Sequence, residues 1–378
     1  MCQTSTHELR GRKLFVWGMG EGGRHWQSFL AKEGCAYIEL QSGLARTQLE
    51  HLPMKGGASI SWLESYGAVQ ADAAKVHGKD WEAAVAAVDE ALESVRPAAA
   101  LEAWHARMKE EIDVRNGKVM HKGMGFAHAQ KLLLGDAFDT AGLDPSAMRQ
   151  GQQENLWLEF AKTGVFPCPD VLDEPLSYQI GQEWIDLLFG SVCEGKSDHW
   201  FAHYHLGVMA DAKGDHEAAK GSYEASLARA DNPWALRCLA LLDGRAGDLT
   251  GAAEKLCRAA QMKPIRPLVI EALDAMRKAE QYEQMLVLLE TIPAAIRSLG
   301  RVKTMEITAL MRTGRLEEAR VLLEGKIVLT DVREGEIQLT NMWFELKAIE
   351  KYGKADEAAI AWARENLKPP KHLDFRMN

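Results

Sequence analysis

A repeat of 33 residues constrains the C-terminal half of this chain more than any other feature. Two successive segments with a helical pattern each contain a turn glycine, Gly214 and Gly247. An alanine follows five positions after each glycine, and a large residue follows four positions later, at Tyr223 and Leu256. Small residues let two antiparallel helices approach closely, and the large residue fills the space one turn on. Self-similarity at such a period is typical of helical hairpins that stack into a solenoid.

The same period continues on both sides of these two segments. Glu280 and Gly314 take the turn position in the next two segments, at spacings of 33 and 34 residues, and Gly353 follows after 39. Upstream, apolar residues recur at helical spacing over residues 81–92, directly after a further turn at Gly78. Five or six hairpins are therefore expected, enough to bury a continuous core between neighbours.

These repeats resemble the tetratricopeptide repeat, in which a pair such as Leu206 and Gly207 also occurs in the first helix of a unit. The resemblance implies that the first helices line a concave groove that binds a protein or peptide. The residues it places at the binding surface are Tyr204, Trp234, Arg237, Arg245, Arg277, Lys278, Arg301 and Arg312.

A groove with this many cations favours a partner that carries carboxylates, because a guanidinium group pairs with a carboxylate in bidentate fashion. Two alternatives remain open. The cations bond neighbouring helices, or the groove holds a segment of the same chain, such as the N-terminal strands or Arg333–Glu336.

Residues 12–70 have a different pattern from the rest of the chain. Three strand-like segments, at 13–17, 35–41 and 58–67, are separated by glycine-rich or polar stretches. The following stretch, up to about residue 196, mixes helical patches with prolines and predicts a connector that includes one hairpin.

A glycine motif lies between the first two strand-like segments. Gly18, Gly20 and Gly23 match the spacing G-x-G-x-x-G, and Glu39 follows at the distance of a ribose-binding acid. Bulky residues such as Arg24 crowd the first turn of the short helix that follows, and no further strand–helix–strand units complete a doubly wound sheet. Nucleotide binding is therefore the less favoured alternative to a glycine-rich loop.

A second resemblance is carried by the strings GRKLFVWGMGEGGRHWQSFL, SISWLESYG and NPWALRCLA. They resemble a family of bacterial proteins of unknown function in which a mutarotase-like β-sandwich precedes tetratricopeptide repeats. In that family the sandwich extends upstream of the position that Met1 occupies, so the resemblance implies that this chain carries only the closing strands. It also implies an association with carbohydrates, because such sandwiches act on sugars with carboxylates and imidazoles.

Polar and aromatic residues on the matching segments are therefore candidates for sugar chemistry. The possible acids and bases are Glu39, Glu50 and His51. The residues expected to contact a sugar are Trp17, Arg24, Trp26, Gln41 and Gln48. Because an incomplete sandwich lacks the rest of a pocket, we do not expect the chain to be catalytic by itself. The alternative is that these side chains face solvent.

Charge and motifs exclude several other classes of function. A net charge of −9 argues against a general nucleic-acid surface, and no apolar run is long enough for a membrane span. The six cysteines form no C-x-x-C pair, as expected for reduced thiols of a cytoplasmic protein. His199, His203 and His205 share helical spacing but lack an acidic ligand at the spacing of zinc enzymes, so we expect no metal and no cofactor.

The sequence therefore predicts a mainly α protein, a tetratricopeptide-like superhelix with a small N-terminal β-rich segment that is the remnant of a sandwich. The expected divisions are a β-rich segment at 1–70, a helical connector at 71–196, a solenoid at 197–368 and a tail at 369–378. The expected function is an interaction scaffold for a protein or peptide, associated with carbohydrate metabolism. The alternative is the C-terminal part of a carbohydrate-active or sugar-binding protein. The oligomeric state is not indicated.

Overall fold

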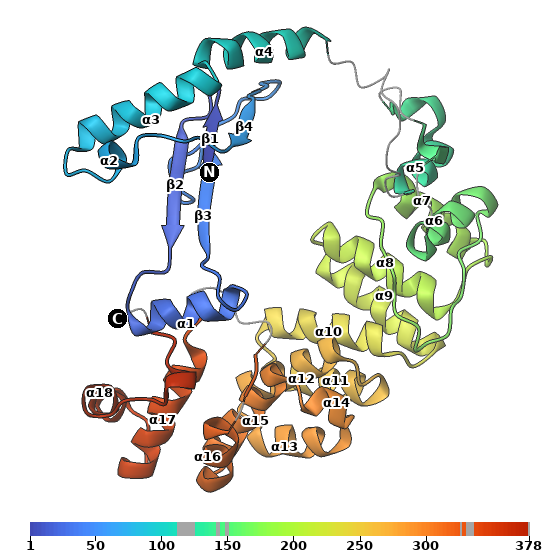
Figure 1. Ribbon diagram of the computed structural model, residues 1–378. Coiled ribbons are helices and arrows are strands. Elements are labelled where there is room, and N and C mark those ends of the chain that lie inside the picture. Colours follow the sequence, from blue (N-terminus) through green and yellow to red (C-terminus); the bar gives the residue numbers. More distant parts are fainter. Residues whose placement is uncertain (112–124, 141–143, 148–150, 326, 330–335, 377–378) are drawn as a thin grey trace. The chain divides into compact units, whose positions relative to one another are not determined.

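The computed structural model describes the whole chain except residues 112–124, 141–143, 148–150, 326, 330–335 and 377–378. The described chain is mainly helical, with four short strands near its N-terminus (Figure 1). It divides into two compact units, Met1–Gly117 with Phe375–Asn378, and Lys118–Asp374. The boundaries expected at residues 70 and 196 fall inside these units.

The first unit contains two separate two-stranded antiparallel sheets. Strand β1 (Cys2–Ser5) pairs with β4 (Glu64–Gly67), and β2 (Gly11–Val16) pairs with β3 (Ile38–Gly43). The three strands expected from the sequence overlap β2, β3 and β4. Strand β1 was not expected, because four polar or small residues carry no apolar alternation.

An aromatic cluster forms the core beside the second sheet. Helix α1 (Glu21–Leu30) contributes Trp26, which is fully buried and stacks on Trp17 with ring centroids 5.2 Å apart. The indole Nε1 of Trp26 donates a hydrogen bond to the backbone oxygen of Phe375 at 3.2 Å. A residue near the C-terminus therefore completes the core of the N-terminal unit.

Three further helices belong to the first unit, α2 (Ala73–Val76), α3 (Trp81–Val95) and α4 (Ala98–Glu111). The side chain of Asp80 caps α3 by accepting a hydrogen bond from the backbone of Ala83. The turn expected at Gly78 is present, but α2 has only four residues. It is too short to be the first helix of a full repeat.

The second unit is helical, with short turns between most helices and an extended connector over residues 164–181 between α6 and α7. The helices that precede the repeats are α5 (Phe126–Leu134), α6 (Gln152–Thr163) and α7 (Gln182–Cys193). The repeat region contains α8 (Trp200–Ala212), α9 (His216–Arg229), α10 (Pro233–Ala246), α11 (Leu249–Met262), α12 (Arg266–Lys278), α13 (Tyr282–Thr291), α14 (Ala294–Arg297), α15 (Gly300–Arg312), α16 (Leu316–Glu324), α17 (Gln338–Tyr352) and α18 (Glu357–Asn366).

The turns of this region confirm the positions expected from the repeat. Gly214, Gly247, Gly314 and Gly353 all have a positive φ, between 68° and 88°. Glu280 takes the same left-handed conformation, with φ 56°, and is the one non-glycine residue that does so in the described chain. A left-handed residue ends one helix and lets the next begin, which produces a helical hairpin.

Close packing inside the first hairpin depends on a glycine. A Cβ atom added at Gly207 on α8 would lie 2.4 Å from Cε1 of Tyr223 on α9. Tyr223 and Ala219 are both buried at this contact. Ser226, further along α9, donates a hydrogen bond to the backbone oxygen of Trp200 at 2.8 Å. Small residues at the crossing and a large one beside it thus perform the roles expected from the sequence.

Candidate functional site

The cations expected to line a groove lie on α10, α12 and α15, but carboxylates of the same chain already pair with them. Arg237 on α10 donates two hydrogen bonds to Glu271 on α12, at 2.6 and 2.7 Å. Arg245, also on α10, donates one at 2.6 Å to Asp211 on α8. In both pairs the partners are 34 residues apart, one repeat.

The same pattern recurs in the later hairpins. Arg301 donates a hydrogen bond to Glu336 at 2.8 Å across 35 residues, and Arg312 forms an ion pair with Glu345 at 2.5 Å across 33. Residues 333–335 of the segment considered as a groove occupant lie outside the described residues. Three of these pairs connect the first helices of successive hairpins, and the fourth connects α15 to Glu336, which lies just before α17. The alternative that the arginines bond neighbouring helices therefore describes them better than an uncompensated basic surface.

Arg277 and Lys278 share one carboxylate on their own helix. They contact Asp274 at 2.7 and 2.9 Å. Burial acts to raise the pKa of Asp274, but the hydrogen bonds from Lys278 and Arg277 outweigh it, so the pKa lies below its ordinary value. Carboxylates of the same chain therefore compensate these two cations as well.

The two aromatic residues expected at the groove contact the chain itself. Trp234 is buried, and its indole Nε1 donates a hydrogen bond to the backbone oxygen of Val171 at 3.0 Å. Trp200, 34 residues earlier, donates in the same way to Pro169 at 3.2 Å. Tyr204 is half-buried and packs beside Tyr223. The extended connector between α6 and α7 therefore covers Trp234, so this residue is not available to a partner.

A hollow of about 340 Å³ opens between α10, α11 and α12. Its lining includes Arg245 and Lys278, two of the expected residues, together with Leu241, and Gly244 and Ala275 leave it open because their side chains are small or absent. Arg245 and Lys278 are each about half exposed. Since guanidinium and ammonium groups carry several donors, each retains hydrogens for a ligand beside its intramolecular ion pair.

A polar cavity of about 650 Å³ lies in the first unit between the two sheets. Glu64 lines this cavity, and its carboxylate accepts hydrogen bonds from Gln3 (2.6 Å), Ser42 (3.0 Å), Tyr66 (2.5 Å) and Trp62 (2.9 Å). The hydrogen bonds, that of Tyr66 above all, lower the pKa of Glu64 to about 2. The site therefore holds a permanent negative charge that is surrounded by neutral donors.

Two of the residues expected to contact a sugar line this cavity. Gln41 and Gln48 line it. Glu39 does not, and instead accepts hydrogen bonds from Tyr37 and Gln41. Glu50 and His51 are exposed outside the lining, so the three possible acids and bases do not converge. Sequence reasoning missed Glu64, although Trp62, Glu64 and Tyr66 alternate along the third expected strand.

The remaining expected sugar contacts are elsewhere. Trp17 and Trp26 are buried in the aromatic core, where Trp26 covers one face of Trp17, and neither is available to stack on a sugar. Arg24 is exposed on α1 and does not line the cavity. The expectation that Trp17 and Trp26 contact a sugar is therefore corrected, because both tryptophans are buried in the core, whereas the expectation for Arg24 stays a prediction.

The glycine motif serves local packing. Strands β2 and β3 flank α1 and pair antiparallel, whereas a dinucleotide-binding unit requires parallel strands. A Cβ atom at Gly23 would lie 2.1 Å from the backbone oxygen of Trp17, and Gly18 has φ 75°. Glycine is thus required at 18 and 23 by the backbone, and the antiparallel pairing of β2 and β3 does not fit the dinucleotide-binding unit that the glycine spacing suggested.

The three histidines with helical spacing do not converge on a common site. His199 contacts the backbone oxygen of Phe166 at 3.0 Å, His203 contacts Asp198 at 2.7 Å, and His205 is buried among aromatic rings. In the described chain, one group has ligand atoms close enough to hold a metal ion, namely His7, Glu8 and Glu102 within 4.8 Å. These side chains are exposed or half-exposed on the surface, where acidic groups are common without a metal.

Comparisons of the chain with protein-family models, with curated proteins and with solved structures found no match. Among the described residues, no helix combines the length and the apolar character that crossing a bilayer requires.

Proposed function

We propose that the second unit is a tetratricopeptide-like solenoid that acts as an interaction scaffold for a protein or peptide. The repeated left-handed turns and the hairpins between them support this architecture. The resemblance to tetratricopeptide repeats assigns the binding surface to the first helices of the hairpins, here α8, α10, α12, α15 and α17.

The observation that carries the proposal is the spacing of the ion pairs. Asp211–Arg245 links α8 to α10, and Arg237–Glu271 links α10 to α12, each across 34 residues. Contacts at one repeat between equivalent helices bring these helices side by side, as a continuous groove requires. These ion pairs orient the adjacent helices, and they do not fill the hollow between α10, α11 and α12.

The hollow has an apolar floor and a charged rim, a combination that suits a peptide side chain. Leu241 and Leu256 supply apolar surface, and Arg245 and Lys278 stand among the charged groups of the rim. We propose that an apolar side chain of the partner enters the hollow while a neighbouring carboxylate bonds the free donors of the rim.

A substitution that fills the hollow tests this function. Peptides are selected from a random display library on the full chain, and their affinity is then measured for Gly244→Leu. Gly244 lies in α10, and a Cβ atom there would meet Ala252 at an ordinary 3.9 Å, so the helix tolerates a side chain. We expect the selected peptides to lose binding.

Gly221→Leu is the matched control, because Gly221 lies on α9 with open space around its Cβ position. This variant adds the same side chain to a helix outside the hollow and should keep full affinity. Selection of no peptide at all, or of peptides that bind Gly244→Leu as tightly as the unchanged protein, argues against the proposal.

The cavity around Glu64 supports a second candidate function, carbohydrate binding by the first unit. A fixed carboxylate, the amides of Gln41 and Gln48 and the ammonium group of Lys13 offer the acceptors and donors that sugar hydroxyl groups use. The resemblance to mutarotase-like proteins points to the same ligand class. Trp62 is 40% exposed, so a sugar ring can reach it.

Titration with a panel of monosaccharides, followed by isothermal calorimetry, tests this second function. Binding that disappears in Glu64→Gln but persists in Glu50→Gln supports it, since Glu50 lies outside the cavity. Equal binding by both variants, or no binding of any sugar, argues against it.

A further inference from the structure

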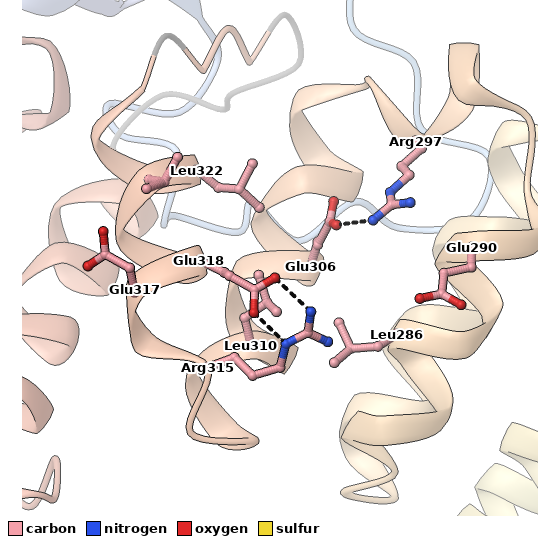
Figure 2. Close-up of a pocket in the computed structure, with 10 residues that line it drawn as sticks. Leu286, Glu290, Arg297, Glu306, Leu310, Arg315, Glu317, Glu318 and Leu322 are labelled. Atoms are coloured by element: carbon pink, nitrogen blue, oxygen red, sulfur yellow. Dashed lines mark hydrogen bonds and ion pairs between the residues drawn. The ribbon is translucent and has the colours of Figure 1, made fainter.

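A second hollow in the repeat region, of about 330 Å³, lies between α13, α15 and α16 (Figure 2). It shares no lining residue with the hollow between α10 and α12. Its apolar surface comes from Leu286, Leu310, Val321 and Leu322. Val321 is 62% exposed, so a substantial part of this surface is open to solvent.

The charged groups around this hollow are unequal in number. Four carboxylates and two guanidinium groups line it, so the lining carries a net charge of −2. Arg315 donates hydrogen bonds to both oxygens of Glu318, at 2.7 and 2.6 Å. Arg297 donates one to the buried Glu306 at 2.5 Å. Each guanidinium group of the lining is therefore hydrogen-bonded to one carboxylate, and the carboxylates of Glu290 and Glu317 are left without a guanidinium partner in the lining.

The two remaining carboxylates differ in their surroundings. Glu317 pairs with Arg320 at 2.6 Å and points away from the hollow (Figure 2). Glu290 lies on the last turn of α13 and forms no hydrogen bond or ion pair with any described residue. Its carboxylate is directed toward the hollow (Figure 2). The hollow thus presents leucine and valine side chains beside an exposed carboxylate that no described residue hydrogen-bonds, although the guanidinium groups of Arg297 and Arg315 are near enough to attract it.

We propose that this hollow binds a cationic side chain, arginine or lysine, of a partner protein. The aliphatic stem of such a side chain lies on Leu286, Leu310 and Val321, and its cationic end bonds Glu290. The volume is at the lower end of ligand pockets, which span roughly 300–1,000 Å³, and suits one side chain better than a folded segment.

Other ligand classes fit the hollow less well. A phosphate or carboxylate ligand meets a lining with net negative charge, whose guanidinium groups are engaged. A purely apolar side chain covers the leucines but takes water away from Glu290 without replacing its hydrogen bonds, which costs free energy. A cation with an apolar stem satisfies both surfaces.

Peptide titration of the full chain tests the proposal. The probe is acetyl-Ser-Leu-Arg-Leu-Ser-amide, compared with the same peptide carrying lysine or citrulline in place of arginine. Citrulline keeps the shape of arginine but has no charge. Because citrulline cannot form a charge-assisted hydrogen bond with Glu290, we expect the citrulline peptide to bind roughly tenfold more weakly.

Variants of the protein separate this site from general charge effects. Glu290→Gln should weaken the arginine and lysine peptides by the same factor, and Val321→Ser should weaken all three. Glu254→Gln removes an exposed carboxylate on α11 and should change nothing. Gly244→Leu should also change nothing, which separates this site from the proposed groove. Equal affinity for arginine and citrulline peptides, no binding by the unchanged protein, or equal losses in Glu290→Gln and Glu254→Gln would overturn the proposal.

Discussion

Arg237 on α10 donates its Nε and Nη2 hydrogens to the two carboxylate oxygens of Glu271 on α12. The hydrogen bonds to Glu271 raise the pKa of Arg237, although partial burial opposes this shift. Because the two residues are one repeat apart, the pair reports directly on the contact between successive first helices.

The Arg237–Glu271 pair should contribute a measurable coupling energy. Both side chains are about one third exposed, so solvent screening limits the coupling in a double-mutant cycle to about 1 kcal/mol. Arg237→Glu should destabilise the protein, and adding Glu271→Arg should restore part of the loss. Urea unfolding provides the free energies. The Arg258–Asp231 pair, about half exposed, is the control, with coupling below about 0.5 kcal/mol. Equal coupling in both pairs would contradict the role given to Arg237.

Glu280 is expected to store backbone strain that glycine would relieve. It occupies the turn where the neighbouring repeats have glycine, and its φ is 56°. A left-handed conformation costs a residue with a Cβ atom roughly 1–2 kcal/mol. Glu280→Gly should therefore raise the free energy of unfolding by about 1 kcal/mol, less the entropy that glycine gains in the unfolded chain. Gly247→Ala, at φ 88°, should lower it by a similar amount. A loss of stability in Glu280→Gly would show that the carboxylate side chain matters more than the backbone.

Two helical glycines should respond in opposite directions to alanine. Gly207→Ala places a methyl group 2.4 Å from the ring of Tyr223, which must shift, so we expect a loss of about 1–3 kcal/mol. Gly221→Ala meets open space and should gain up to about 1 kcal/mol from helix propensity. Thermal unfolding of the two variants measures the difference. Similar melting temperatures would show that α8 and α9 do not approach as closely as described.

The sequence predicts the helices of the repeat region well because their signals are local. Left-handed turns need glycine, and close helix crossings need small side chains, so both leave a periodic trace in the chain. Glu280 was found only because the period pointed to a position that its residue type does not suggest. The strands of the first unit were also located approximately, since alternation is local too.

Pairings between distant residues could not be read from the sequence. For Arg237 and Arg245 the sequence left open whether they face a partner or bond neighbouring helices, because a single chain does not reveal that Glu271 and Asp211 lie opposite them. The sequence also does not indicate that Phe375, almost 350 residues away, packs against Trp26 in the core of the first unit. Glu64 was missed because its donors come from three separate strands, which the order of residues does not bring together.

His205 occupies an environment that disfavours a charged histidine. It is buried on α8 among the rings of Trp157, Phe166, Phe201 and Tyr204, with centroid distances of 4.5–5.3 Å. No described residue forms a hydrogen bond with either ring nitrogen. Burial lowers the pKa of His205 to about 3, far below the ordinary value near 6.5.

The stability of the protein should consequently fall as the pH decreases from about 6.5 toward 3. In that range the unfolded chain binds a proton at His205 and the folded chain does not, so the free energy of unfolding decreases by up to about 1.4 kcal/mol per pH unit from this group. Above pH 6.5 the residue is neutral in both states and contributes no pH dependence.

His205→Leu removes the proton-binding group and should give a shallower dependence of the unfolding free energy on pH between pH 4 and 6.5, measured by urea unfolding. Stability at pH 7 should be equal or higher, because two unbonded nitrogens leave the core. His199, whose pKa is lowered chiefly by partial burial, keeps some slope in the variant. His372→Gln, at an exposed position, should retain the full slope. An unchanged slope in His205→Leu would mean that the ring is protonated, or reached by water, in the folded protein.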